Sequence, residues 1–291
     1  MKIVLAEHFG ICFGVRDAIA QAEALAQRAP LTILGELAHN PMVRQRLRSA
    51  GAEEGALDRF ETARSARVLI TAHGASDKRK SAWVSAGFDV RDGTCPLVRH
   101  AHAQLRLLVE AGFHPVVIGL KTHVEVRGLT EDFPESSVVN DSVDLRMLPE
   151  RARYGIISQT TQPIDHVRRL VNEIRRHYAT AEIRFVDTVC KPTKDRQSAL
   201  YRLIQMAPVI VVVGGKESNN TRQLVLTCQA AGRRAIHIER PDELEADQFE
   251  NVDAVGLTGG TSTLRETVEA VFRRLQEISS DQEKSKMEEQ S

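Results

Sequence analysis

One construction occurs three times in this chain: a short apolar strand, a turn that ends in a cysteine, and an amphipathic helix that starts at the cysteine. The three cysteines are Cys12, Cys95 and Cys190. An internal repeat has to be recognised before single elements are interpreted, because it decides the architecture of the whole chain. The repeat predicts three similar lobes, each of which supplies one thiol to a shared centre.

Each cysteine helix is followed by two more apolar strands, and each of these strands ends in a polar loop. The first loops carry His39, His123 and Ser218, which lie 27 or 28 residues after the cysteine of their unit. Strands of four to six residues that alternate with helices are typical of βαβ units. Ligands of such folds bind at the carboxyl ends of the strands. We therefore predict an α/β fold of three pseudo-symmetric lobes, each a small parallel sheet with flanking helices, around one central site.

The repeat predicts a first lobe at residues 1–95, a second at 96–190 and a third at 191–278. Residues 279–291 lose apolar periodicity and become charged, which predicts a disordered tail.

Charge and hydropathy exclude several kinds of partner. Lysine plus arginine and aspartate plus glutamate both number 39, so no broad electrostatic binding to nucleic acid is expected. The longest apolar run, at residues 206–213, is too short to cross a bilayer. The N-terminus has no signal-peptide pattern, so we expect a cytoplasmic protein without a membrane partner.

The three repeated cysteines have the pattern of a metal centre. A cytoplasmic location favours unpaired thiols, and a helix N-terminus stabilises the thiolate form that binds metals. Three protein ligands leave one position open, as in catalytic metal sites. Zinc with a bound water and a [4Fe–4S] cluster with one unligated iron both satisfy this pattern. The fourth cysteine, Cys228, has no counterpart in the other units and is expected to be a small buried side chain.

The polar loops indicate the kind of ligand. Imidazole, hydroxyl and amide donors suit an oxyanion such as phosphate or diphosphate, and helix N-termini would add backbone N–H groups. The predicted anion-binding residues are His39, His73, His123, Thr160, Ser218, Asn219, Asn220, Thr261 and Ser262. Glu125 lies two residues after His123 and is the candidate proton donor.

Nine short motifs follow one another along the chain. They are G-I-C-F-G-V around Cys12, A-H-N at 38–40, A-H-G-A-S at 72–76, D-G-T-C-P-L-V around Cys95, H-V-E-V-R-G at 123–128, S-Q-T-T at 158–161, D-T-V-C-K-P-T-K-D-R-Q at 187–197, G-G-K-E-S-N-N-T at 214–221 and T-G-G-T-S-T at 258–263. Through these motifs the chain resembles the 4-hydroxy-3-methylbut-2-enyl diphosphate reductase family, over essentially its whole length except the tail.

The resemblance implies a [4Fe–4S] cluster on the three repeated cysteines, at the centre of the three lobes. It implies that two electrons and two protons remove the hydroxyl of (E)-4-hydroxy-3-methylbut-2-enyl diphosphate as water. The products would be isopentenyl and dimethylallyl diphosphates, at the end of the methylerythritol phosphate route to isoprenoids. Glu125 would donate the proton, aided by Thr160 and His123. The substrate would be bound by His39, His73, His123, Thr160, Ser218, Asn219, Asn220 and Ser262.

Two other classes of function stay open on sequence alone. One is a zinc hydrolase of a phosphorylated metabolite, with Glu125 as general base. The other is a non-catalytic protein that binds a phosphometabolite and has structural thiols. No G-x-G-x-x-G follows a strand, so a reductase would need an external electron donor, a ferredoxin or a flavodoxin. We expect a monomer or a weak dimer.

Overall fold

The structure is a computed structural model that describes residues 1–38 and 40–288, the last four of these without their side chains. The chain divides into two compact units. The larger unit is Phe13–Cys190, and the smaller unit combines Met1–Cys12 with the chain that follows Cys190.

The described residues form three parallel four-stranded sheets with the same order of strands. The first lobe has the order β3 (Ala52–Gly55), β2 (Leu31–Leu34), β4 (Arg67–Ile70) and β5 (Asp89–Asp92). The second has β7 (Ser137–Val139), β6 (His114–Ile118), β8 (Arg153–Ser158) and β9 (Glu182–Phe185). The third has β11 (Arg234–Ile238), β10 (Val209–Val213), β12 (Ala254–Gly259) and β1 (Lys2–Leu5). Three repeats of one parallel topology confirm the predicted fold class.

The predicted lobe boundaries are wrong for the first strand. The repeat predicts that Lys2–Leu5 belongs to the first lobe, but β1 pairs with β12 of the third, with Lys2 opposite Ala254 and Leu5 opposite Leu257. The repeat itself explains the difference. The strand that leads to Cys95 is an edge strand of the lobe before it, and so is the strand that leads to Cys190. Strand β1 leads to Cys12 and takes the same place in the third sheet.

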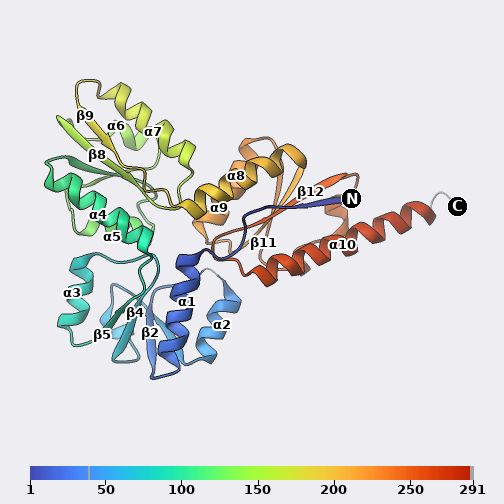
Figure 1. The fold of residues 1–291 in the computed structure, drawn as a ribbon, viewed down its shortest axis with the longest axis horizontal. Coiled ribbons are helices and arrows are strands. Elements are labelled where there is room, and N and C mark those ends of the chain that lie inside the picture. Colours follow the sequence, from blue (N-terminus) through green and yellow to red (C-terminus); the bar gives the residue numbers. More distant parts are fainter. Residues whose placement is uncertain (39, 289–291) are drawn as a thin grey trace. The chain divides into compact units, whose positions relative to one another are not determined.

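The helices flank these strands (Figure 1). They are α1 (Phe13–Ala26), α2 (Pro41–Ser49), α3 (Asp77–Ser85), α4 (Pro96–Glu110), α5 (Val124–Glu131), α6 (Ser142–Arg146), α7 (Ile164–His177), α8 (Lys191–Met206), α9 (Asn219–Ala230) and α10 (Arg265–Glu288). Short 3-10 turns occupy Phe60–Thr62, Pro241–Glu243 and Ala246–Phe249. As predicted, α1, α4 and α8 each begin at the residue after a repeated cysteine.

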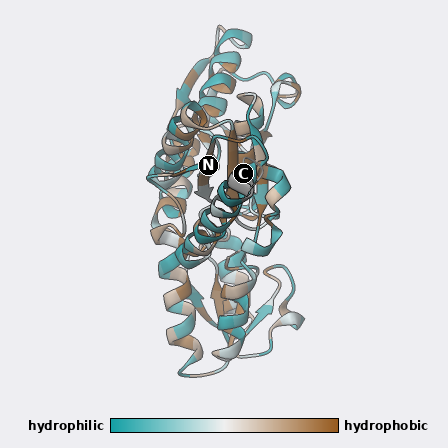
Figure 2. Ribbon diagram, turned by 90° about the vertical axis from the view of Figure 1, so that its right-hand side faces the viewer, coloured by the Kyte–Doolittle hydropathy of each residue, from teal (hydrophilic) through white to brown (hydrophobic). Residues whose placement is uncertain are grey.

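Each sheet is covered on both faces, as parallel sheets require. In the second lobe, Val116 and Ile118 of β6 pack against α6 and α7, whereas Val117 packs against α4 and α5. Figure 2 shows many of the strands in brown, whereas the helices around them are mixed teal, white and brown. Full burial of one such aliphatic side chain stabilises the fold by about 1.5–3 kcal/mol. This packing holds the strand ends, and therefore the polar loops, in fixed positions within each lobe.

The predicted disordered tail differs from the structure over most of its length. Helix α10 continues to Glu288, and residues 289–291 lie outside the described part of the chain. The helix packs on the third sheet through Val268, Val271, Leu275 and Ile278. The next turns of α10 contact the N-terminal amino group of the chain. This group donates a hydrogen bond to Ser279 Oγ at 2.9 Å and forms an ion pair with Glu283 at 3.4 Å. Apolar periodicity does not predict this extension, because the contacts of Ser279 and Glu283 with the N-terminus are polar.

Candidate active site

Glu125 is a buried carboxylate at the carboxyl ends of two neighbouring strands. It lies in the first turn of α5, after β6, and only 1% of its surface is exposed. Its Oε1 accepts a hydrogen bond from Thr160 N at 2.7 Å, and its Oε2 accepts one from Thr160 Oγ1 at 2.9 Å. Thr160 follows β8, the direct neighbour of β6. The fold therefore brings together two of the predicted catalytic residues.

Burial changes the acidity of this carboxyl group. Loss of hydration raises the pKa of Glu125 from 4.5 to about 7, although both hydrogen bonds from Thr160 favour the ionised form. A group with a pKa near the working pH can both hold and release a proton, which suits general acid catalysis.

The raised pKa predicts a pH dependence of stability. The folded protein binds the Glu125 proton more tightly than the unfolded chain, so stability should fall as pH rises from about 4.5 to about 7. Glu125→Gln keeps the shape and removes the ionisation. The free energy of unfolding of the variant, minus that of wild type, should increase by up to about 3 kcal/mol between pH 4.5 and 7. Above pH 7 this difference should stay constant. Urea unfolding at pH 5, 6, 7 and 8 measures the difference, and a constant difference would contradict the raised pKa.

Two of the predicted histidines lie side by side. His123 is the N-cap of α5, and its Nδ1 accepts a hydrogen bond from Glu125 N at 3.2 Å. That contact assigns the ring hydrogen of a neutral His123 to Nε2. The His73 ring, from the loop after β4, meets the His123 ring edge to face, with 5.6 Å between the ring centres. His39 lies outside the described residues, but its neighbour Asn40 caps α2.

The predicted residues of the third lobe gather at the ends of β10 and β12. Ser218 is the N-cap of α9, and Asn219 and Asn220 are the first residues of that helix. Asn220 Oδ1 accepts a hydrogen bond from Thr261 N at 3.0 Å, which joins the two loops. Ser262 follows in the second loop, and all these side chains are buried. Because Asn220 uses its carbonyl oxygen on the backbone, its amide N–H group is the part suited to an anion.

Each of the three repeated cysteines makes the same kind of backbone hydrogen bond. Cys12 N donates to Thr261 O at 3.2 Å, Cys95 N to Ala72 O at 3.0 Å, and Cys190 N to Thr160 O at 2.9 Å. In every case the acceptor belongs to the polar loop that follows the neighbouring strand. The contact ties the backbone of each cysteine to a loop that carries predicted ligand-binding residues.

The surroundings of the cysteines fit a metal-binding role. All three are partly buried at helix N-termini, and none of the four cysteines forms a disulfide. A Cβ atom on Gly14 would lie 2.5 Å from Cys95 Sγ, so glycine keeps that space open. Cys228 is fully buried and burial raises its pKa to about 12, which confirms its prediction as a small buried side chain.

The three predicted metal ligands are divided between the two compact units. Cys12 belongs to the smaller unit, and Cys95 and Cys190 belong to the larger one. No group of three or more histidine, cysteine, aspartate or glutamate side chains that could hold a metal ion occurs in the described part of the chain. The three-cysteine ligand set therefore stays a prediction.

The model of the family described as "LytB protein" matches residues 3–276. The chain belongs to the LytB family.

Relatives of this LytB chain are similar over almost their whole length. Proteins named 4-hydroxy-3-methylbut-2-enyl diphosphate reductase from Geobacter sulfurreducens and Trichlorobacter lovleyi are 34% and 33% identical to it. The alignments cover 96% of this chain, with 98% of the first relative and 99% of the second. The protein of the same name from Aquifex aeolicus is 32% identical, over 96% of this chain and 97% of its own length.

Two solved structures share the fold. The E-1-hydroxy-2-methyl-but-2-enyl-4-diphosphate reductase from Plasmodium falciparum has a TM-score of 0.86 at 24% identity, over 92% of this chain and 86% of that chain. A structure of (E)-4-hydroxy-3-methyl-but-2-enyl diphosphate reductase has a TM-score of 0.67 at 31% identity, over 95% of this chain and 100% of that chain. No helix in the described part of the LytB chain is long and apolar enough to span a membrane.

A buried arginine, Arg196, lies beside the cysteine loops, and no sequence pattern predicts its burial. Arg196 of α8 is only 5% exposed. Its guanidinium group donates hydrogen bonds to Gly10 O and, at 2.9 Å, to Pro192 O. Gly10 lies two residues before Cys12, and Pro192 lies two residues after Cys190. An arginine on a helix is usually exposed. The one sequence signal for a role of Arg196 is its position six residues after Cys190.

Arg196→Gln should destabilise the LytB fold strongly. Arg196 uses two different guanidinium nitrogens for the two carbonyl groups, and the shorter glutamine has a single amide nitrogen that does not reach both. A buried carbonyl without its partner costs about 1–3 kcal/mol. We expect the free energy of unfolding to fall by about 2 kcal/mol or more in a denaturant titration. Arg202→Gln is the control, because Arg202 lies on the same helix and forms a surface ion pair with Glu7 at 2.6 Å. Such pairs contribute about 0–1 kcal/mol, so equal losses in the two variants would contradict the role of Arg196.

Proposed function

We propose that this LytB protein is a 4-hydroxy-3-methylbut-2-enyl diphosphate reductase. It would use two electrons and two protons to remove the substrate hydroxyl as water, and it would release isopentenyl and dimethylallyl diphosphates. The observation that carries the proposal is Glu125, a buried acid with a pKa of about 7 at the carboxyl ends of β6 and β8. The names of relatives that align with 96% of the chain support the same reaction.

The proposed cofactor is a [4Fe–4S] cluster on Cys12, Cys95 and Cys190. When bound, such a cluster supplies electron transfer, and three thiolate ligands leave one iron open to substrate. The chain contributes three partly buried cysteines at helix N-termini, where the thiolate form is favoured. The backbone hydrogen bonds between each cysteine and a polar loop restrain the main chain at all three proposed ligands.

In this proposal Glu125 is the proton donor and Thr160 is its positioning partner. The hydrogen bonds from Thr160 N and Oγ1 fix both carboxylate oxygens, so the proton is delivered from a defined place. His123 orients the first turn of α5 through its contact with Glu125 N. The remaining predicted residues would bind the diphosphate, whose charge suits imidazole, hydroxyl and amide donors. They are His39, His73, His123, Ser218, Asn219, Asn220 and Ser262.

The proposal includes the partners expected from the sequence. A ferredoxin or flavodoxin would supply the electrons, and the protein would work in the cytoplasm as a monomer or weak dimer.

An anaerobic visible spectrum with iron and sulfide analysis tests the cofactor first. We expect broad visible absorption and about four irons per chain. The diphosphate alcohol is then added with a chemical reductant, and the two isoprenoid diphosphates are quantified. A colourless protein with stoichiometric zinc would overturn the reductase proposal in favour of a hydrolase. An iron–sulfur protein that leaves the substrate unchanged would contradict the proposed reaction while keeping the cofactor.

A further inference from the structure

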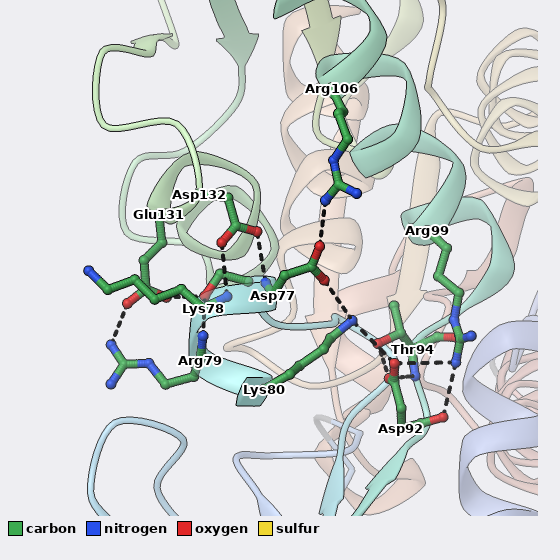
Figure 3. A network of polar contacts seen from close by, with 11 residues as sticks. Asp77, Lys78, Arg79, Lys80, Asp92, Thr94, Arg99, Arg106, Glu131 and Asp132 are labelled. Carbon is green, nitrogen blue, oxygen red and sulfur yellow. Dashed lines mark hydrogen bonds and ion pairs between the residues drawn. The ribbon is translucent and has the colours of Figure 1, made fainter. Parts of the chain in front are cut away.

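Two lobes of the larger unit are joined where the C-terminal end of α5 meets the N-terminus of α3 (Figure 3). The Asp132 carboxylate, from the second lobe, accepts hydrogen bonds from Asp77 N at 2.7 Å and Lys78 N at 3.0 Å. Ser76 Oγ accepts the next one, from Arg79 N at 2.9 Å. The first N–H groups of a helix have no partner within the helix. A side chain of the second lobe therefore completes the cap of a first-lobe helix.

Glu131 adds an ion pair to this junction. Its carboxylate accepts a hydrogen bond from Ser76 Oγ at 2.6 Å and pairs with Arg79 Nη2 at 2.6 Å. Burial by itself would raise the pKa of Glu131, but the contacts with Ser76 and Arg79 outweigh it and lower the pKa. Glu131 is therefore ionised at neutral pH. Only 29% of its side chain and 27% of that of Arg79 are exposed, so water screens this pair less than a surface pair.

A third contact involves Asp77. Its carboxylate pairs with Arg106 of α4, another helix of the second lobe, and with Lys80 at 3.9 Å (Figure 3). The N-terminus of α3 is thus held from both α4 and α5. We call Ser76–Arg79 together with Glu131 and Asp132 the interlobe clamp.

Helix α5 touches the same first-lobe segment at two more levels. In its middle, a Cβ atom on Gly128 would lie 3.4 Å from Ala75 Cα, so the helix backbone passes close to the loop. At its N-terminus, the His123 ring meets the His73 ring. Eight helical residues rise about 12 Å, so the contacts follow α5 along its whole length. The clamp and the histidine pair are the two ends of one contact that runs along α5.

We propose that Glu131 and Asp132 are positioning residues, which lock α5 to the first lobe and thereby set the spacing of His73 and His123 for a diphosphate group. The inference rests on the diphosphate-binding role proposed above. His73 lies three residues before Ser76, and His123 caps the helix whose last residue is Glu131. A change in the angle between α5 and α3 would therefore move one imidazole relative to the other. Neither clamp carboxylate contacts the Glu125–Thr160 pair.

Asp132→Ala tests the proposal, and Asp141→Ala is its matched control. Asp141 also caps a helix, because its carboxylate accepts hydrogen bonds from Val143 N at 2.8 Å and Asp144 N at 3.1 Å. These bonds lie within the second lobe. Both variants lose a capping carboxylate, but only Asp132→Ala loses a contact between lobes. Asp132→Asn serves as the milder variant, since its amide oxygen can still accept one hydrogen bond.

The first measurement is the affinity of the cluster-loaded protein for inorganic diphosphate, by calorimetry. We expect Asp132→Ala to bind it roughly tenfold more weakly, which corresponds to about 1.4 kcal/mol. Asp132→Asn should lie between this variant and wild type, and Asp141→Ala should match wild type. The second measurement is a pulsed electron paramagnetic resonance distance between spin labels on Val84→Cys and Met147→Cys. These exposed sites lie in the first and second lobes. The distribution of distances between the two labels should broaden or shift in Asp132→Ala and should not change in Asp141→Ala.

The outcomes separate this inference from the proposed function. Unchanged affinity in Asp132→Ala would overturn the positioning role, with or without a change in the label distance. An unchanged label distance would show that the clamp does not hold the lobes and would overturn it as well. If wild type binds no diphosphate, the ligand set proposed above is wrong, and the label distance still decides whether the clamp fixes the two lobes.

Discussion

Glu125→Gln is expected to lower turnover of the diphosphate alcohol at least about 100-fold, because general acid catalysis contributes about 10²–10⁴ to a rate. The amide has the size of the carboxyl group. Its oxygen can accept from Thr160 N and its N–H can donate to Thr160 Oγ1, so the local geometry should persist. Substrate affinity should therefore stay within about threefold of wild type. Wild-type turnover should also fall as pH rises above about 7, because the acid loses its proton there.

The assay is product formation under anaerobic conditions with a chemical reductant, so that no protein donor limits the rate. Glu135→Gln is the control, since Glu135 is an exposed carboxylate shortly after α5. Turnover that survives in Glu125→Gln would assign the proton to another group. A parallel loss in Glu135→Gln would point to a general effect of charge on this part of the lobe.

Cys95→Ser is expected to remove most of the iron and the visible absorption, and with them at least about 99% of the activity. A serine hydroxyl is a poor replacement for a thiolate in an iron–sulfur site, where soft sulfur ligands are preferred. Cys228→Ser is the matched control. Its side chain is fully buried within the apolar cluster of α8, α9 and β10, so a hydroxyl there should cost about 1–3 kcal/mol of stability. The iron content should remain that of wild type.

Iron and acid-labile sulfide per chain, measured after anaerobic reconstitution, decide this prediction. Full iron content in Cys95→Ser would remove this residue from the proposed ligand set. Iron loss in Cys228→Ser but not in Cys95→Ser would show that Cys228, and not Cys95, is a ligand of the cofactor.

Features that depend on the local order of residues along the chain could be predicted from the sequence. Strand and helix periodicity reflects which face of each element is buried, so the three strand–cysteine–helix units and the α/β class could be predicted. The association of Thr160 with Glu125 was implied by the family resemblance, and the strand rule by itself predicted only that the polar loops lie at one edge of the sheet.

Other features depend on which distant segments meet, and periodicity carries no such information. The pattern of Lys2–Leu5 identifies a strand, but only the pairing with β12 assigns it to the third lobe. The helical extension of α10 depends on contacts with the first residue of the chain. Because these partners lie far apart in sequence, no local signal could have predicted them.

By itself, the sequence determined the repeat, the three thiols at helix starts and the acid beside a histidine, because each of these is a short-range pattern of residue types. Only the tertiary structure decided that Glu125 is buried with a raised pKa, that Arg196 reaches the loop of Cys12, and that Asp132 caps a helix of another lobe. The physical reason is that hydration and hydrogen-bond partners are set by neighbours in space, which a folded chain draws from distant parts of its sequence.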